Sequence, residues 1–327
     1  MENTTNLKNA TEAVNTAPQM AVPYVGAAIP LFWHGVLSGD AGTRIPTGFE
    51  QLDKLLDGGL RAGLYVLLAS PGAGKTTLGL QMMDSFVRAD RDVIFFSGEM
   101  LTEDLLAKIY SRYSYLMGDE RSILTAGGVL KLKENPYATD IAKALHNAYL
   151  PVASRTVIVP PDKINTITAI PDIVGAHIAA TGNYPVVCID YLQIIASKFG
   201  EATERQNVDK LLGQIKEMCS QYGIPVLLIS SVNRAAYKDK LTLSAAKESG
   251  GIEYTADVVL GLDYRDPDKG SKYYHTHYNK PRELNLQILK NRLGTWGSVN
   301  LTMHAAYNYF EEEPASVSGT KTLRSLY

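Results

Sequence analysis

Short apolar runs alternate with longer amphipathic segments from residue 46 to about residue 263. The runs have the length of buried strands, and the segments between them have the length of helices. The predicted strands are 64–68, 92–96, 156–159, 185–189 and 226–229, and the predicted helices are 76–87, 102–110, 163–181 and 207–222. This alternation predicts an α/β fold, a mainly parallel sheet with helices on both faces. In such a fold the active site lies at the carboxyl ends of the strands.

The pattern changes between residues 256 and 310. Three predicted strands, 257–263, 284–290 and 298–304, follow one another with no helix between them. Such a succession predicts antiparallel strands that extend one edge of the sheet at its C-terminal end. The stretch 264–282 between the first two strands contains His275 and His277. Two histidines with no partner pair make a poor metal site, so a mobile hairpin excursion is the favoured interpretation.

Both ends of the chain lack this alternation. Residues 1–45 predict a flexible arm with one short apolar patch around Phe32 and Trp33. That patch either packs on its own domain or docks on a neighbouring subunit. Residues 311–327 begin with three glutamates and a proline, which predicts a mobile tail. Residues 46–310 are therefore the predicted folded domain.

Composition narrows the class of protein. Hydrophobic residues make up 45% of the chain and charged residues 20%, as in folded globular domains. The formal net charge is -2, so any contact with nucleic acid must come from a local basic patch. Cys188 and Cys219 cannot form a disulfide framework, and we expect buried reduced thiols in a cytoplasmic protein. No apolar run is long enough to span a membrane, and no signal peptide is predicted.

The strongest chemical signal is the segment Ala69–Thr76, which reads Ala-Ser-Pro-Gly-Ala-Gly-Lys-Thr. It follows a predicted strand and opens a predicted helix, as a phosphate-binding P-loop does. Its lysine reaches the β- and γ-phosphates of a nucleotide such as ATP, and its threonine offers a hydroxyl to Mg²⁺. A dinucleotide site is excluded because the third glycine of that motif is missing. The residues expected to bind nucleotide are Ser70, Pro71, Gly72, Ala73, Gly74, Lys75, Thr76 and Thr77.

Two acids follow other predicted strands and can complete a Mg²⁺-nucleotide site. Asp190 ends the apolar run 186–189 and can hold Mg²⁺, together with Thr76. No acid follows Asp190, so the general base must come from elsewhere. Glu99 follows the strand 92–96, which we expect beside the P-loop strand, and it can orient the attacking water. The alternative for Glu99 is a place in the N-cap region of the next helix, where acids are common.

A series of blocks in one order resembles the RecA-type ATPase domain of DnaB-like replicative helicases. Besides the P-loop, the blocks are Thr47–Asp53, Phe95–Met100, Ile189–Gln193, Val232–Arg234, Lys247–Glu253, Ala256–Val258 and Lys290–Gly294. The resemblance covers residues 45–310. It implies an ATP-hydrolysing DNA helicase, a ring-forming and hexameric motor that translocates on single-stranded DNA and unwinds duplex DNA in replication.

The first block is also similar to the RadA and KaiC group of RecA-fold ATPases. The alternative function is therefore an ATPase that remodels protein or recombination complexes without unwinding. An inert nucleotide-binding scaffold is disfavoured because Lys75, Glu99, Asp190 and Arg292 are all present.

The resemblance assigns roles to particular residues. Glu99 is the expected catalytic acid and Asp190 the Mg²⁺ partner, while Lys290 and Arg292 are expected to reach the γ-phosphate bound by an adjacent subunit. Residues two apart on a strand face the same way, so one strand can present both cations. The alternative is that these two cations only protect an exposed edge strand.

A basic stretch after the last predicted parallel strand is the candidate DNA-binding loop. The residues expected to bind single-stranded DNA are Arg234, Lys247, Glu248 and Gly250. Lys247 and the backbone N–H groups near Gly250 can hold phosphates. A solvated basic loop is the alternative interpretation.

The chain departs from the family pattern in two places. Ser231 stands where the family has a glutamine that senses the γ-phosphate, and Gln193 is the candidate substitute. The scaffold domain and linker helix of bacterial replicative helicases are not expected within residues 1–45. Primase binding through that domain is therefore not carried over, and a separate helicase loader or primase is a candidate partner.

Overall fold

The computed structural model describes residues 25–38, 43–197, 203–232, 241–243, 249–277, 280–292 and 294–314. The chain divides into two compact units, residues 1–44 and 45–327. In the first unit the structure describes the helix α2 (Val25–Ser38), which was not predicted in the arm. Its apolar side chains, including Phe32 and Trp33, are exposed.

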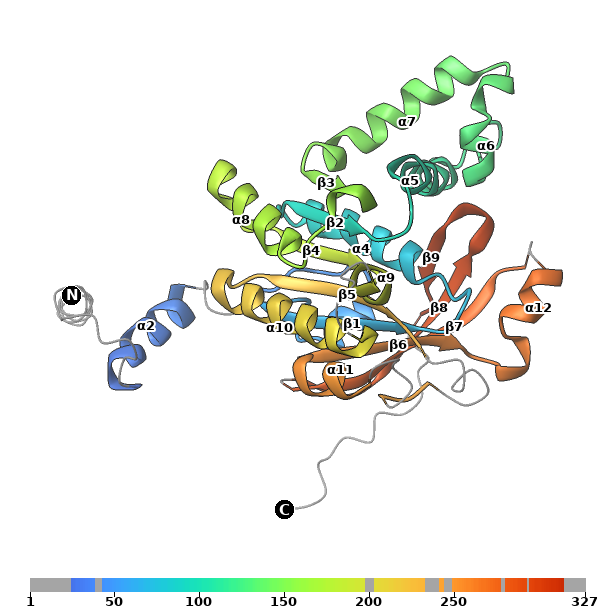
Figure 1. Ribbon diagram of the computed structural model, residues 1–327. Helices are drawn as coiled ribbons and strands as arrows, with labels where there is room; N and C mark the ends of the chain where they lie inside the picture. The colour runs from blue at the N-terminus through green and yellow to red at the C-terminus, as the bar shows by residue number, and fades with distance from the viewer. Residues whose placement is uncertain are drawn as a thin grey trace. The chain divides into compact units, whose positions relative to one another are not determined.

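Within the described residues, nine strands of the second unit form one sheet in the order β3-β2-β4-β5-β1-β6-β7-β8-β9 (Figure 1). They are β1 (Gly63–Ala69), β2 (Val93–Ser97), β3 (Thr156–Val159), β4 (Val186–Asp190), β5 (Pro225–Ser231), β6 (Val258–Tyr264), β7 (Arg282–Asn291), β8 (Ser298–His304) and β9 (Tyr309–Glu312). The strands from β3 to β6 in this order are parallel, and the β6–β7, β7–β8 and β8–β9 pairs are antiparallel. The predicted fold class is confirmed.

Helices cover both faces of the parallel part of the sheet. On one face lie α4 (Lys75–Arg88), α5 (Thr102–Met117) and α7 (Ala138–Ala153), and on the other lie α8 (Ala169–Thr181), α9 (Leu192–Ser197), α10 (Glu204–Tyr222) and α11 (Ser249–Thr255). The side chains of β1 alternate between the two cores: Tyr65 and Leu67 belong to the first, and Val66 and Leu68 to the second. A strand buried on both faces must be apolar throughout, which is why β1 reads as one apolar run.

Short helices complete the described chain. They are α3 (Glu50–Leu55), α6 (Ala126–Leu130), α12 (Ser271–Thr276) and the 3₁₀ turns Leu132–Glu134, Pro161–Lys163, Pro267–Lys269 and Ala305–Tyr307. None of the described helices is both long and apolar enough to cross a membrane. Cys188 and Cys219 are free and buried, and burial raises the pKa of each thiol to about 12.

The structure corrects several local predictions. β2 does not lie beside β1, because β4 and β5 come between them. Local apolar runs show where strands are, but the packing of the crossover helices decides their order. The sequence patterns also missed the C-terminal part of α5 and all of α6, α7 and β9. Residues 311 and 312 form the end of β9, so the predicted tail cannot begin at residue 311.

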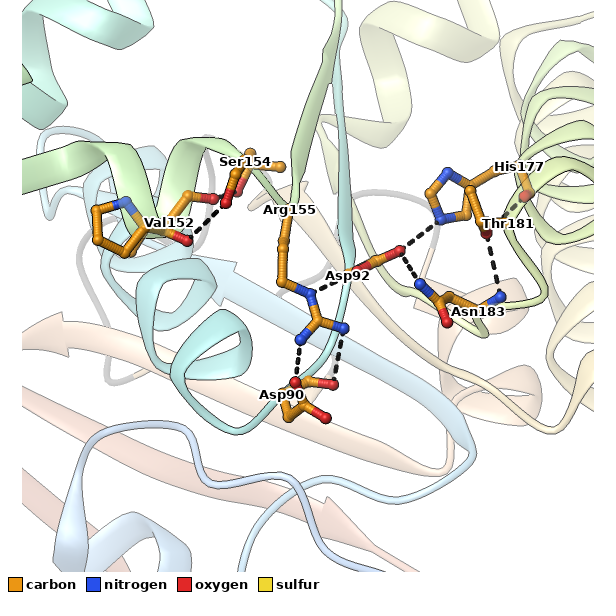
Figure 2. Close-up of polar contacts among 10 residues, drawn as sticks. Asp90, Asp92, Val152, Ser154, Arg155, His177, Thr181 and Asn183 are labelled. Carbon is orange, nitrogen blue, oxygen red and sulfur yellow. Dashed lines mark hydrogen bonds and ion pairs between the residues drawn. The ribbon is translucent and has the colours of Figure 1, made fainter.

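A polar cluster joins the amino ends of three strands, at the sheet edge opposite the P-loop (Figure 2). Asp92, just before β2, accepts hydrogen bonds from Arg155 Nε at 2.8 Å and Asn183 Nδ2 at 2.9 Å, and His177 Nε2 lies 3.1 Å away. Arg155 also pairs with Asp90. Burial alone would raise the pKa of Asp92, but the bonds from Arg155, Asn183 and His177 outweigh it and lower the pKa. The charged carboxylate therefore stabilises the junction of β2, β3 and β4.

We expect Asp92→Asn to lower the free energy of unfolding by about 1–3 kcal/mol, because Arg155, Asn183 and His177 lose a charged acceptor. Urea denaturation at neutral pH measures this, with exposed Asp172→Asn as the control. The folded-state pKa of Asp92 is lowered, so its contribution is present above the unfolded pKa of about 3.9 and is lost as pH falls through the folded pKa. The stability difference between wild type and Asp92→Asn should therefore shrink in acid. A difference that stays constant down to acid unfolding would contradict this role.

Candidate nucleotide-binding site

The P-loop connects β1 to α4 at the carboxyl edge of the parallel strands. Gly72 and Gly74 have positive φ angles of 74° and 90°, which glycine adopts without strain. A Cβ at Gly74 would lie 2.7 Å from the Met303 side chain and 3.0 Å from that of Phe310. Gly74 is also the N-cap residue of α4, so the loop leads directly into a helix N-terminus that favours anions. Conformation and close packing both require glycine here.

The strand β6 supports the crest of the P-loop. Ser70 Oγ donates to Asp263 Oδ1 at 2.7 Å, and the Tyr264 hydroxyl donates to the Pro71 carbonyl oxygen at 3.2 Å. Ser70 and Pro71 are thus held from the side, and the Ala73 N–H closes the loop by donating to the Ser70 carbonyl oxygen at 3.1 Å. The loop is preorganised by a strand almost 200 residues further along the chain.

Thr76 and Asp190 meet where Mg²⁺ would be held. Thr76 Oγ1 donates to Asp190 Oδ2 at 2.6 Å, across from α4 to the end of β4. Asp190 is only 4% exposed, and its Oδ1 has no hydrogen-bond partner among the described residues. Burial raises the pKa of Asp190, against the hydrogen bond from Thr76 and the charge of Lys75. A buried, half-satisfied carboxylate beside a hydroxyl fits a divalent cation, whose charge would keep the carboxylate ionised.

Glu99 lies past the carboxyl end of β2 and is exposed. The N-cap residue of α5 is Leu101, so Glu99 stands outside that helix. Ser97, at the end of β2, pairs with Asp190, and the Gly98 N–H donates to the Asp190 carbonyl oxygen at 2.5 Å, so Glu99 directly follows backbone that contacts the end of β4. The Lys75 ammonium lies 4.8 Å from the centre of the Tyr191 ring. The fold therefore brings Lys75, Asp190 and Glu99 to one edge, although β2 and β1 are not neighbours.

Two further cations at this site were missed from the sequence. Arg282, at the start of β7, donates to the carbonyl oxygen of Gly72. Lys108, on α5, is half-buried and donates to Asn308 Oδ1 at 3.1 Å. Burial lowers the pKa of Lys108, against the charge of Asp190. Lys108 could have been found in the sequence, because it is a lysine on a largely buried helix face. Arg282 could not, because only strand pairing brings it to the P-loop.

Lys290 and Arg292 lie elsewhere, at the other end of β7. Arg292 Nη2 donates to the Tyr254 carbonyl oxygen at 2.6 Å, and Arg292 Nη1 lies 3.6 Å from Asp257 Oδ1. Lys290 Nζ donates to the Ala256 carbonyl oxygen at 2.6 Å. Both cations are thus held at the C-terminal end of α11, where unpaired helix carbonyls attract positive charge.

The length of β7 separates these cations from the P-loop of the same chain. Arg282 contacts the loop, and a strand of this length places Asn291 about 30 Å away at about 3.3 Å per residue. Burial and the neighbouring charge of Arg292 lower the pKa of Lys290. Within the described residues, the structure brings the P-loop, Asp190 and Glu99 together but leaves Lys290 and Arg292 at the opposite edge.

The Gln193 side chain is hydrogen-bonded to the end of β5. Its Nε2 donates to Ser230 Oγ at 2.8 Å, and its Oε1 accepts the Ser231 N–H at 3.1 Å. This buried amide cross-links the strand that carries Asp190 to the strand that leads into the candidate DNA-binding loop. Of the predicted DNA-binding residues, Arg234, Lys247 and Glu248 lie outside the described residues, and Gly250 lies in the first turn of α11.

The fold and the site together define a P-loop nucleoside triphosphatase with a RecA-like sheet. A model of the DnaB-like helicase C terminal domain family matches residues 44–312, and the chain belongs to this family. The chain is 27% identical to the replicative DNA helicase DnaB of Geobacillus stearothermophilus and 28% identical to the replicative DNA helicase DnaC of Bacillus subtilis. Each alignment covers 82% of this chain and 56% of the relative, so the chain spans little more than half of their length.

Solved structures share the fold. One solved ATPase domain superposes with a TM-score of 0.72 at 21% identity, covering 88% of this chain and 98% of its own. A DnaB-like replicative helicase, solved to study its interactions with primase, gives 0.69 at 21% identity over 93% of this chain and 70% of its own. A KaiC-like protein from Pyrococcus horikoshii gives only 0.55 at 16% identity, over 83% of this chain and 99% of its own.

We expect Lys108→Met to weaken Mg²⁺-ATP binding by about 10-fold or more, because a positive charge that acts on Asp190 is lost. Titration with a fluorescent ATP analogue measures this affinity. Exposed Lys131→Met is the matched control and should bind as the wild type does. Unchanged affinity in folded Lys108→Met would remove Lys108 from the site.

Proposed function

We propose that this chain is an ATP-driven motor that translocates on single-stranded DNA and unwinds duplex DNA, as an oligomeric ring. The main support for this proposal is the distance between two groups of residues along β7. The P-loop, Asp190 and Glu99 lie at one edge of the sheet, and Lys290 and Arg292 are held at the other. Such a chain carries both halves of a site that only two copies can complete. The named activity of the DnaB relatives supports unwinding over protein remodelling.

The residues of the site have distinct roles in hydrolysis. Backbone N–H groups of Gly72–Thr77 surround the phosphates, and Lys75 contacts the β- and γ-phosphates. Thr76 and Asp190 would hold Mg²⁺, which would neutralise negative charge on the phosphate oxygens. Glu99 orients the water that attacks the γ-phosphate, and an exposed acid at this edge is suited to that role. Arg292 and Lys290 of an adjacent copy stabilise the charge that develops in the transition state.

Coupling to DNA runs through α11. In the sequence Lys247 lies two residues before this helix, whose C-terminal carbonyls hold Lys290 and Arg292. A single DNA strand bound by Lys247 and the backbone near Gly250 would therefore shift the position of Lys290 and Arg292. In this scheme, Arg234 and Glu248 border the same DNA-binding loop.

We further propose that the ring is hexameric and that α2 docks on the neighbouring copy. The helix α2 carries apolar side chains such as Phe32 and Trp33, which suit a docking contact with another copy. A separate helicase loader or primase remains a candidate partner for assembly on DNA.

We expect Arg292→Ala to bind ATP almost normally but to lower turnover by about 10³-fold or more. Lys75→Ala should lose turnover because its own phosphate contact is gone. Mixing the two variants should restore part of the activity, since some interfaces then pair an intact loop with an intact Arg292. Steady-state ATPase assays after confirmed subunit exchange measure this. Absence of any recovery would mean that Arg292 does not act in trans.

We expect single-stranded DNA to raise the ATPase rate, and the stimulation to fade as salt increases because phosphate contacts release counterions. Lys247→Ala should weaken the stimulation and leave basal hydrolysis intact. The exposed Lys210→Ala serves as the control. Strand displacement is then measured on a forked duplex with protein preassembled on its single-stranded tail. If the protein shows no DNA stimulation and no strand displacement under these conditions, the RadA- or KaiC-like alternative is supported instead.

A further inference from the structure

Two exposed aromatic side chains come from the segments that hold Arg292. Tyr254, on α11, is 78% exposed, and its carbonyl oxygen accepts the hydrogen bond from Arg292. Trp296, in the β7–β8 turn four residues after Arg292, is 67% exposed. No aromatic side chain in the described part of the chain is more exposed than these two. Exposed tryptophan and tyrosine beside an arginine is the composition of interface hot spots.

The turn that presents Trp296 is firmly held. Thr295 Oγ1 donates to the Leu55 carbonyl oxygen at 3.1 Å, and Asn291 Nδ2 donates to the Thr295 carbonyl oxygen at 3.2 Å. A Cβ at Gly297 would lie 2.6 Å from Leu55 Cδ2, so the turn packs closely on α3. Since the backbone on both sides is fixed, the exposed indole is preorganised for contact, and little ordering entropy is lost on binding.

We propose that Tyr254, Arg292 and Trp296 form a docking patch for a second copy of this chain. This inference rests on the proposed trans action of Arg292 and adds to it the contacts that seat the arginine. Arg292 is half-exposed and lies at the edge of the sheet opposite its own P-loop. The phosphate that it would contact belongs to another copy, and Tyr254 and Trp296 lie on the two segments next to Arg292, the end of α11 and the β7–β8 turn.

The receiving surface is the rim of the nucleotide site beside Glu99. Leu101, two residues after Glu99, is 59% exposed and offers an apolar contact there. Closure of aromatic side chains over this rim excludes water around Arg292 and the γ-phosphate. Because charge interactions strengthen as the local dielectric falls, the patch makes the trans arginine more effective as well as holding the copies together.

Tryptophan fluorescence tests the patch directly, because the chain has only two tryptophans, Trp33 and Trp296. Trp33→Phe leaves Trp296 as the single reporter. When rings assemble with Mg²⁺ and a non-hydrolysable ATP analogue, without DNA, the emission should shift to the blue and acrylamide quenching should fall. Unchanged quenching in rings verified by sedimentation would overturn the proposal. Protection that appears only when single-stranded DNA is added would also overturn it, in favour of base stacking.

Substitutions give a second, independent readout. Trp296→Thr and Tyr254→Ala should each raise the protein concentration needed for half-maximal ATPase by roughly 10-fold. Turnover at saturating protein should also fall, because water then reaches Arg292. Exposed Tyr184→Ala, at the amino end of β4, is the control and should not shift this concentration. Leu101→Ala should weaken assembly less in the Trp296→Thr background than alone, if the two side chains meet.

The outcomes separate this inference from the proposed function. Wild-type protein that never assembles, and hydrolyses ATP as a monomer, would overturn both. The patch alone would be overturned if rings assemble and mixed Arg292→Ala and Lys75→Ala rings regain activity, but acrylamide still quenches Trp296 as in the unassembled protein. Equal assembly by Trp296→Thr, Tyr254→Ala and wild type would do the same.

Discussion

The antiparallel pairing of β7 with β6 is the constraint on which the charge arrangement of this domain depends. β6 runs parallel to β1 and ends beside the P-loop, so β7 must begin there and run back to the opposite edge. One strand therefore places Arg282 on the P-loop and carries Lys290 and Arg292 away from it. A cation pair that cannot serve its own nucleotide is the basis for a site shared between copies.

The nucleotide edge is stabilised mainly by contacts between elements that are distant in sequence. Arg112 on α5 donates to Asp84 Oδ2 at 2.9 Å and to the Leu80 carbonyl oxygen at 3.1 Å, and both acceptors belong to α4. This ion pair is almost fully buried, so removing either partner alone would leave an uncompensated charge. It connects the helix that opens at the P-loop to the helix that follows Glu99. The helix after the P-loop and the helix after Glu99 thus form one packed unit.

At the opposite edge of the sheet, α11 contacts Lys290 and Arg292, and Asp257 follows it. The candidate DNA-binding loop precedes this helix, the carbonyl oxygens at its C-terminal end hold Lys290 and Arg292, and Asp257 follows it. Asp257 accepts a hydrogen bond from the Leu64 N–H at 2.8 Å and pairs with Lys216. Lys290 is therefore tied to the end of α11, and Arg292 is tied through Asp257 to the strand that leads into the P-loop.

The sequence by itself determined the α/β class and most of the strands, and it singled out Lys75, Thr76, Asp190 and Glu99 as candidate site residues. These conclusions depend on local patterns: β-runs buried on both faces must be apolar, and a P-loop requires its glycines and lysine at fixed spacing. The prediction that Glu99 lies near the P-loop rested on a wrong neighbour for β2, and it holds in the structure because all parallel strands end at one edge.

Only the tertiary structure decided the strand order, the contacts of Arg282 and Lys108 with the nucleotide edge, and the separation of Arg292 from it. It also decided that Gln193 bonds to β5 and that Trp296 stays exposed on a rigid turn. Each of these features depends on pairing or packing between segments far apart in the chain. Such pairing is set by the summed burial of both cores, and no local pattern around a single residue contains that information.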